Sequence, residues 1–208
     1  MAPFDIGTLD LVAAWGFNSK NGIPDRTATA ELASLPRRPA HESLERSEGQ
    51  LRKTAPIAPD LSGIAKGYGV DRLAETLEGY GITGYLVSID GEVRAHGRKS
   101  GGAMWQVAVE QPRRGACDIA GHVALEDGAL ATSGDYRHVV EQDGHSFAHT
   151  MDPRRGRPVT NAVHAVTVRA PTCMLADAWA TALLVSGPDL GQRLAAANGI
   201  DAMFAVDP

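Results

Sequence analysis

An acid and a hydroxyl stand four residues apart in one predicted helix. Asp177 and Thr181 belong to a segment that runs from about Met174 to Val185, and residues four apart project from the same face of a helix. A carboxylate and a hydroxyl are hard oxygen donors that suit Mg²⁺. The alternative is structural, with Asp177 at the helix dipole and Thr181 bonded to a carbonyl. Because a buried unpaired carboxylate is costly and the segment is apolar, a functional Asp177 is favoured.

A glycine-rich turn from Asp60 to Gly67 carries the second candidate site. It reads DLSGIAKG and opens onto a predicted helix that includes Val70 and Leu77. Backbone N–H groups and the dipole at a helix start favour an anion, and Lys66 would add a positive charge against a phosphate. The spacing matches neither a Walker loop nor a dinucleotide fingerprint. An ordinary glycine loop with a solvated lysine is the alternative.

His149 is the candidate general base, because a histidine side chain titrates near neutral pH. It precedes a turn that Asp, Pro and Gly predict over residues 152–156. Other histidines lie downstream of residue 90, so histidine alone is a weak signal. Residues 127–137 offer small side chains and hydroxyls for close approach of a ligand, with a simple hairpin as the alternative. The chain has no Gly-x-Ser-x-Gly elbow, which disfavours a serine hydrolase.

Strand and helix patterns predict the scaffold that must position these residues. Strands are predicted over 85–89, 92–96, 105–110, 123–125, 129–132, 136–140, 162–170 and 202–206. Helices are predicted over 8–17, 27–35, 70–80, 174–185 and 190–197, with Thr172 as an N-cap and Gly81 and Gly199 as C-terminal caps. Residues 37–59 are polar and proline-rich and predict an edge strand and loop. Without a regular β-α-β alternation, the class is α+β with a mainly antiparallel sheet.

The composition limits the functional classes. The 208 residues are 43% hydrophobic, enough for a core, and the net charge of -5 does not suggest a nucleic acid partner. Cys117 and Cys173 either pair across the fold or are both buried free thiols, and free thiols are favoured. We find no signal peptide at the start and no membrane-spanning run, so localisation is open from this chain.

Four blocks of sequence, in this order, resemble the ApbE family. They are DLSGIAKGYGVD (60–71), ALATSGDYRH (129–138), HTMDPRRGRPV (149–159) and ADAWATAL (176–183). A further segment, FDIGTLDLVAAWGF (4–17), is similar to the part of the family that precedes them. The resemblance covers nearly the whole chain and implies a T-fold-like α+β domain over residues 1–208.

The resemblance also implies an activity, an FAD:protein FMN transferase. Such an enzyme takes FAD with Mg²⁺, transfers FMN to a Ser or Thr hydroxyl of an acceptor flavoprotein, and releases AMP. Matched to the family motifs, the metal ligands are Asp177, Thr181 and the backbone carbonyl of Gly63. The flavin-nucleotide contacts are Phe4, Asp5, Asp60, Lys66 and the backbone of Met151. Lys66 and His149 are the residues that assist the transfer.

The chain departs from the family in lacking a substantial N-terminal region that supplies further FAD contacts, so it is either a fragment or a short form. Thr150 and Met151 stand where two aliphatic residues are common. Two alternatives stay open: a Mg²⁺-dependent FAD pyrophosphatase that yields FMN and AMP, and a flavin-binding module without turnover. An open sheet edge would favour a homo-oligomer. If a longer parent carries an export signal, the family resemblance suggests the periplasmic side of the inner membrane.

Overall fold

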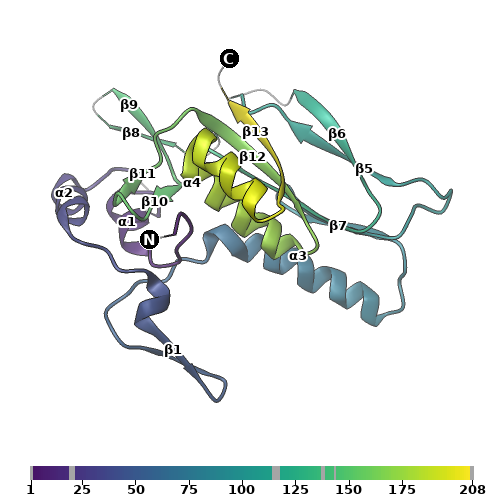
Figure 1. Ribbon diagram of the computed structural model, residues 1–208, viewed down its shortest axis with the longest axis horizontal. Coiled ribbons are helices and arrows are strands. Elements are labelled where there is room, and N and C mark those ends of the chain that lie inside the picture. Colours follow the sequence, from purple (N-terminus) through teal and green to yellow (C-terminus); the bar gives the residue numbers. More distant parts are fainter. Residues whose placement is uncertain (1, 19–21, 114–117, 137–138, 143, 207–208) are drawn as a thin grey trace. The chain divides into compact units, whose positions relative to one another are not determined.

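The computed structural model describes residues 2–18, 22–113, 118–136, 139–142 and 144–206 (Figure 1). Its contacts divide the chain into two compact units. We call the first the hairpin unit, which comprises Met1–Leu61 and Arg137–Asn161, and the second the sheet unit, which comprises Ser62–Tyr136 and Ala162–Pro208. The sheet unit therefore contains the predicted metal ligands and Lys66, whereas the hairpin unit contains the other predicted flavin contacts and His149.

A five-stranded antiparallel sheet with the order β13-β12-β7-β4-β3 forms the centre of the sheet unit. The strands are β3 (Tyr85–Ile89), β4 (Glu92–His96), β7 (Gly128–Gly134), β12 (Val163–Ala170) and β13 (Asp201–Val206). Asp90 and Gly91 join β3 to β4 with φ values of 49° and 104°, the left-handed pair that two-residue hairpins favour. The predicted turn at this position is confirmed.

Two helices cover one face of this sheet: α3 (Ser62–Gly79) and α4 (Cys173–Ala197). Alternate residues of a strand point to the same face, and Ala131, Val166 and Val168 pack against Ala176 and Leu183 of α4. Figure 1 shows α4 lying across β12. This apolar layer forms the main core, and it holds α4 against the sheet.

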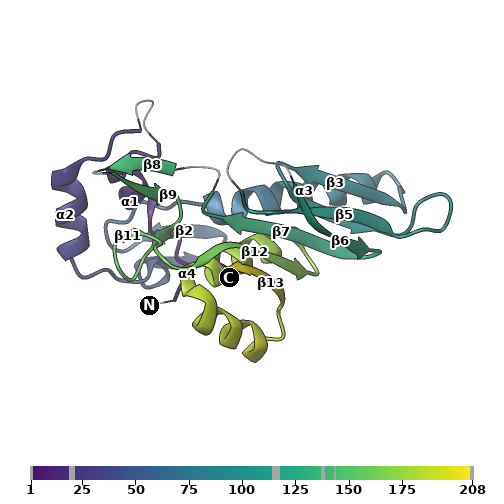
Figure 2. The same ribbon diagram turned by 90° about the horizontal axis from the view of Figure 1, so that it is seen from above.

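The opposite face of the sheet packs against a separate hairpin of β5 (Trp105–Glu110) and β6 (Ile119–Leu125). Ala95 of β4 and Leu130 of β7 form a second apolar cluster with Val109 and Leu125 of the hairpin. Figure 2 shows β5 and β6 next to β7. Strand β7 is thus buried between the helices and the hairpin, so residues 128–134 form a central strand.

The start and the break of α4 agree with the sequence prediction. The Thr172 side chain accepts the backbone N–H of Leu175 at 3.4 Å, as an N-cap does. The backbone leaves the helical region at Gly187, where φ is 76°, and Pro188 follows. The two predicted helices therefore form α4 as two segments joined at a kink.

The prediction for the start of α3 is wrong. The glycine-rich segment was expected to form a turn ahead of the helix, yet the helix begins at Ser62 and includes Gly63, Lys66 and Gly67. Glycine is a poor helix former in isolation, but tertiary packing overrides that preference here, because α4 packs directly against the backbone at Gly67.

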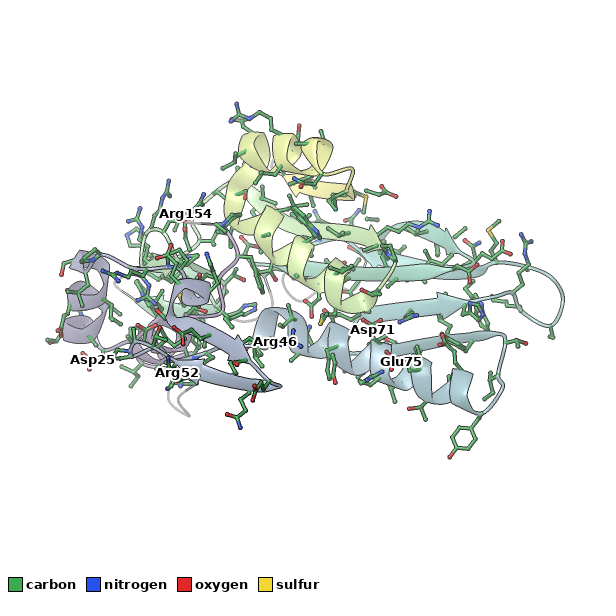
Figure 3. The ribbon with its side chains drawn as sticks, turned by 60° about the horizontal axis from the view of Figure 1, so that its bottom comes forward. Asp25, Arg46, Arg52, Asp71, Glu75 and Arg154 are labelled. Atoms are coloured by element: carbon green, nitrogen blue, oxygen red, sulfur yellow. The ribbon has the colours of Figure 1, made fainter. Side chains whose placement is uncertain are left out.

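The hairpin unit consists of short elements. Its helices are α1 (Leu9–Ala14), α2 (Arg26–Ser34) and the 3-10 helix η1 (Ala40–Ser43). Its strands pair as β1 (Leu44–Ser47) with β2 (Gln50–Lys53), β8 (Val139–Gln142) with β9 (His145–Ala148), and β10 (Met151–Asp152) with β11 (Arg157–Pro158). Asp25 caps α2 by accepting two backbone N–H groups (Figure 3). Residues 37–59, expected as an edge strand and loop, contain η1 and a complete β1–β2 hairpin.

These elements confirm the predicted α+β class with antiparallel sheets and packed helices. Cys173 is a buried free thiol, whereas Cys117 lies outside the described residues. Within the described part of the chain, no helix combines the length and apolar character needed to cross a membrane.

Candidate functional site

Helices α3 and α4 pack backbone against backbone at Gly67. A methyl group at this position would lie 2.5 Å from the carbonyl oxygen of Cys173 and 2.7 Å from Cα of Met174. One turn further along α3, Asp71 accepts the N–H groups of Cys173 and Met174, each at 2.9 Å. It also pairs with Arg94 of β4 at 2.8 Å; Figure 3 labels Asp71. Asp71 therefore caps α4 from another element and sets the antiparallel register of the two helices.

Asp177 lies one turn into α4 and is 4% exposed. Its Oδ2 accepts the backbone N–H of Gly67 at 3.0 Å. In an α-helix the N–H of one residue bonds to the carbonyl of the residue four positions earlier, here Gly63. Asp177 therefore competes with the Gly63 carbonyl for the Gly67 N–H. Burial raises the pKa of Asp177, while the Gly67 N–H and the charge of Lys66 act in the opposite direction. A buried carboxylate that is not paired with a cation is stabilised when a cation binds nearby.

The antiparallel register predicts that Gly63 faces Thr181. Asp71 meets the first residues of α4, and Gly67 meets Asp177 one turn on. Because the helices are antiparallel, one turn earlier in α3 corresponds to one turn later in α4. This places Gly63 opposite Thr181. The Thr181 hydroxyl is 2.9 Å from the hydroxyl of Ser133 on β7. Sequence reasoning missed Ser133 as a support for Thr181, because only the packing of β7 against α4 reveals it.

Lys66 pairs with an acid that the sequence prediction did not include. Its Nζ donates to Glu92 Oε1 at 2.8 Å, and the Glu92 side chain is 2% exposed. Burial raises the pKa of Glu92, the bond from Lys66 opposes that rise, and the charge of Asp177 adds to it. The signal in the sequence was weak but present: Glu92 and Arg94 alternate with Val93 and thus place charges on the face of β4 that the helices cover.

The residues present fit Mg²⁺. Asp177 and Glu92 are both buried carboxylates, Lys66 bonds to Glu92, and Glu92 Oε2 is buried without a hydrogen-bond partner. A carboxylate of Asp177, a hydroxyl of Thr181 and a carbonyl of Gly63 are all oxygen donors. Mg²⁺ is commonly held by one or two carboxylates, with substrate phosphates as further ligands. A cation would balance the excess of carboxylates over ammonium groups here.

In the hairpin unit, the structure brings Asp60 to the Phe4–Asp5 segment. The backbone N–H of Asp60 donates to the carbonyl of Ile6 at 2.6 Å. The Asp5 carboxylate accepts the N–H of Gly7 at 2.7 Å and that of Ala40 at 2.9 Å. These bonds give Asp5 a structural task in holding the first segment against η1. They also fix the backbone on which Phe4 and Asp5 were predicted to meet the flavin nucleotide.

His149 lies on the connection between β9 and β10 in the same unit, and Met151 is the first residue of β10. The His149 ring meets the ring of Phe17 edge to face, with centroids 6.4 Å apart. Met151 is 6% exposed and pairs with Pro158 in the β10–β11 ladder. Buried Asp152 holds the following turn through two bonds to the Arg154 guanidinium (Figure 3). The backbone at Met151 is therefore fixed by its neighbours.

Comparison with known proteins identifies the family. The model of the ApbE family matches residues 2–204. An FAD:protein FMN transferase of Vibrio cholerae serotype O1 is 40% identical over 204 residues, which are 97% of this chain and 61% of that protein. One of Haemophilus influenzae is 36% identical over 205 residues, 94% of this chain and 58% of that protein. The chain therefore spans about six tenths of the length of these curated relatives.

Solved structures give the same result. The apo form of the flavinyl transferase ApbE from Pseudomonas stutzeri superposes with a TM-score of 0.84 at 36% identity, covering 99% of this chain and 64% of that one. The ApbE protein from Thermotoga maritima gives 0.85 at 29% identity, covering 98% of this chain and 67% of that one. With the fold and the family model in agreement over nearly all residues, this chain belongs to the ApbE family.

Proposed function

We propose that this chain is the catalytic part of a Mg²⁺-dependent FAD:protein FMN transferase. In this reaction FMN passes from FAD to a Ser or Thr hydroxyl of an acceptor flavoprotein, and AMP is released. The observation that carries the proposal is the pair of buried carboxylates Asp177 and Glu92, with the partly exposed Lys66 bonded to Glu92. The acids favour a cation, and the lysine suits a phosphate. The names of the relatives, FAD:protein FMN transferases, support the same substrate class.

Asp177, Thr181 and the carbonyl of Gly63 would hold Mg²⁺ in this proposal. When bound, the ion would neutralise charge on the pyrophosphate of FAD. Lys66 would add a second positive charge for the same phosphates, and its side chain is 40% exposed. Fixed positive groups aimed at developing charge are among the largest contributions to phosphoryl transfer.

The chemistry exchanges one phosphorus–oxygen bond for another. The acceptor hydroxyl oxygen bonds to the phosphorus of the FMN half, and the bond from that phosphorus to the oxygen of the AMP phosphate breaks. In this proposal His149 takes the proton of the hydroxyl, as the family resemblance implies. A neutral imidazole is a suitable base at neutral pH.

The experiment that tests the proposal uses isosteric variants of two acids on α4. Asp177→Asn removes the buried charge, and Asp189→Asn changes an exposed acid on the same helix as a matched control. Each protein is incubated with FAD and Mg²⁺, with and without an acceptor flavoprotein domain. AMP release and the mass of the acceptor are measured, and FAD binding is followed in parallel by flavin fluorescence.

We expect the unmodified chain and Asp189→Asn to release AMP and to add one FMN to the acceptor, and Asp177→Asn to fall to background. AMP release without a labelled acceptor would refute transfer and support FAD pyrophosphatase activity instead. Bound FAD without AMP would refute catalysis by this chain and leave a flavin-binding module. Absence of both would refute both FAD binding and catalysis by this chain under these conditions.

A further inference from the structure

Glu92 differs from Asp71, another buried acid of the sheet unit, in how its oxygens are satisfied. Asp71 accepts two backbone N–H groups and an arginine, as expected of a structural carboxylate. Glu92 has a bond from Lys66 to Oε1, while Oε2 is buried without a partner. Buried polar atoms are nearly always satisfied in folded proteins. A half-satisfied buried carboxylate beside a predicted ligand site indicates a role toward the ligand.

The Lys66 ammonium has two acids within ion-pairing distance. Glu92 Oε1 is at 2.8 Å and buried, whereas Asp90 Oδ2 is at 3.9 Å on a side chain that is 69% exposed. A long, exposed pair contributes little, so Glu92 is the effective anchor. Lysine has a flexible four-carbon stem, and without an anchor its ammonium samples many positions.

The choice of ion-pair partner for Lys66 also affects Asp177. Among the described residues, Lys66 pairs with Glu92 and Asp90, not with Asp177. Asp177 senses the lysine only as a more distant charge. Glu92, and not Asp177, therefore holds the ammonium.

We propose that Glu92 is a positioning residue: it fixes the Lys66 ammonium for the phosphates of FAD and keeps it from neutralising Asp177. This role rests on the proposed function for its ligand. The Glu92–Lys66 anchor itself is a property of the chain alone, so it can be tested separately. The most direct variant is Glu92→Gln, which keeps the shape and removes the charge. Asp90→Asn is the matched control, because it removes the exposed acid near the same lysine.

The first measurement needs no flavin. The chain is treated briefly with acetic anhydride, and the acetylation of each lysine is measured by mass spectrometry, with exposed Lys53 as the internal reference. We expect Glu92→Gln to raise the rate at Lys66 about tenfold, the scale of losing a hydrogen bond between charged groups. Asp90→Asn should change it less than about twofold. An unchanged rate at Lys66 in a folded Glu92→Gln protein would overturn the anchor.

The second measurement is a double-mutant cycle on AMP release, with Lys66→Met as the partner. Because Glu92 acts through Lys66, Glu92→Gln should lower kcat/KM about tenfold or more in the unmodified chain and have no further effect beside Lys66→Met. Multiplicative effects would mark Glu92 as merely structural and overturn the proposal. If Glu92→Gln does not fold, Glu92→Asp replaces it: retracting the carboxylate should raise Lys66 acetylation, and an unchanged rate would count against the anchor. A chain that never releases AMP refutes the proposed function while the acetylation result still decides the anchor.

Discussion

Gly67→Ala tests the helix contact on which the candidate site is built. The added methyl would stand 2.5 Å from the Cys173 carbonyl oxygen, whereas ordinary contact starts at 3.4 Å, so the difference of 0.9 Å must be opened between two backbones. Overpacking of this kind costs about 1–3 kcal/mol. Alanine offsets about 1 kcal/mol of that cost through its higher helix propensity. Gly79→Ala in the same helix is the matched control, because nothing lies within 4 Å of its added methyl.

Since both variants replace a helical glycine by alanine, the difference between them isolates the clash. We expect Gly67→Ala to be less stable than Gly79→Ala by about 2 kcal/mol in denaturant unfolding, or about 4–8 °C in melting temperature. The variant should also lose stabilisation by Mg²⁺ with FAD, because the Gly67 N–H can no longer hold Asp177 in place. A Gly67→Ala protein that melts at or above the temperature of Gly79→Ala would refute the close helix packing and the site geometry derived from it.

Three further outcomes follow from the sheet unit. Asp71→Ala removes the cap of α4 and leaves an arginine without its buried partner, so chemical unfolding should show a loss of about 3–5 kcal/mol; a loss below about 1 kcal/mol would contradict the cap. Burial first, then the hydrogen bond and charge of Glu78, raise the pKa of Tyr85 from 10.0 to about 12. The folded state therefore binds this proton more tightly, so stability should fall as pH rises from about 10 to about 12. Glu78→Gln should lower the Tyr85 pKa in a spectrophotometric titration, and an unchanged midpoint would exclude this cause. Ser133→Ala removes the support of the Thr181 hydroxyl and should weaken Mg²⁺ binding about 10–100-fold by calorimetry in the presence of FAD, with unchanged affinity as the contrary result.

Local patterns in the sequence determined most of the scaffold. Strands β3, β4 and β5 have the predicted bounds, because alternation and a left-handed Asp-Gly turn are local properties of the chain. The Thr172 cap and the break at Gly187 could also be predicted, because capping and glycine conformation depend on a few adjacent residues. The four family motifs likewise indicated the family, which the comparisons confirmed.

Only the tertiary structure decided how the candidate site is assembled. The low helix propensity of glycine argued against a helix through Gly63 and Gly67, yet α3 begins at Ser62. The close contact with α4 at Gly67 leaves no room for a side chain there. From the sequence, Glu92 is an ordinary strand residue. Only the fold brings its carboxylate to the ammonium of Lys66, 26 positions away in sequence. Sequence spacing specifies which residues share one element, whereas burial and charge pairing depend on contacts between elements. The residue types were therefore predictable, and the partners that position them were not.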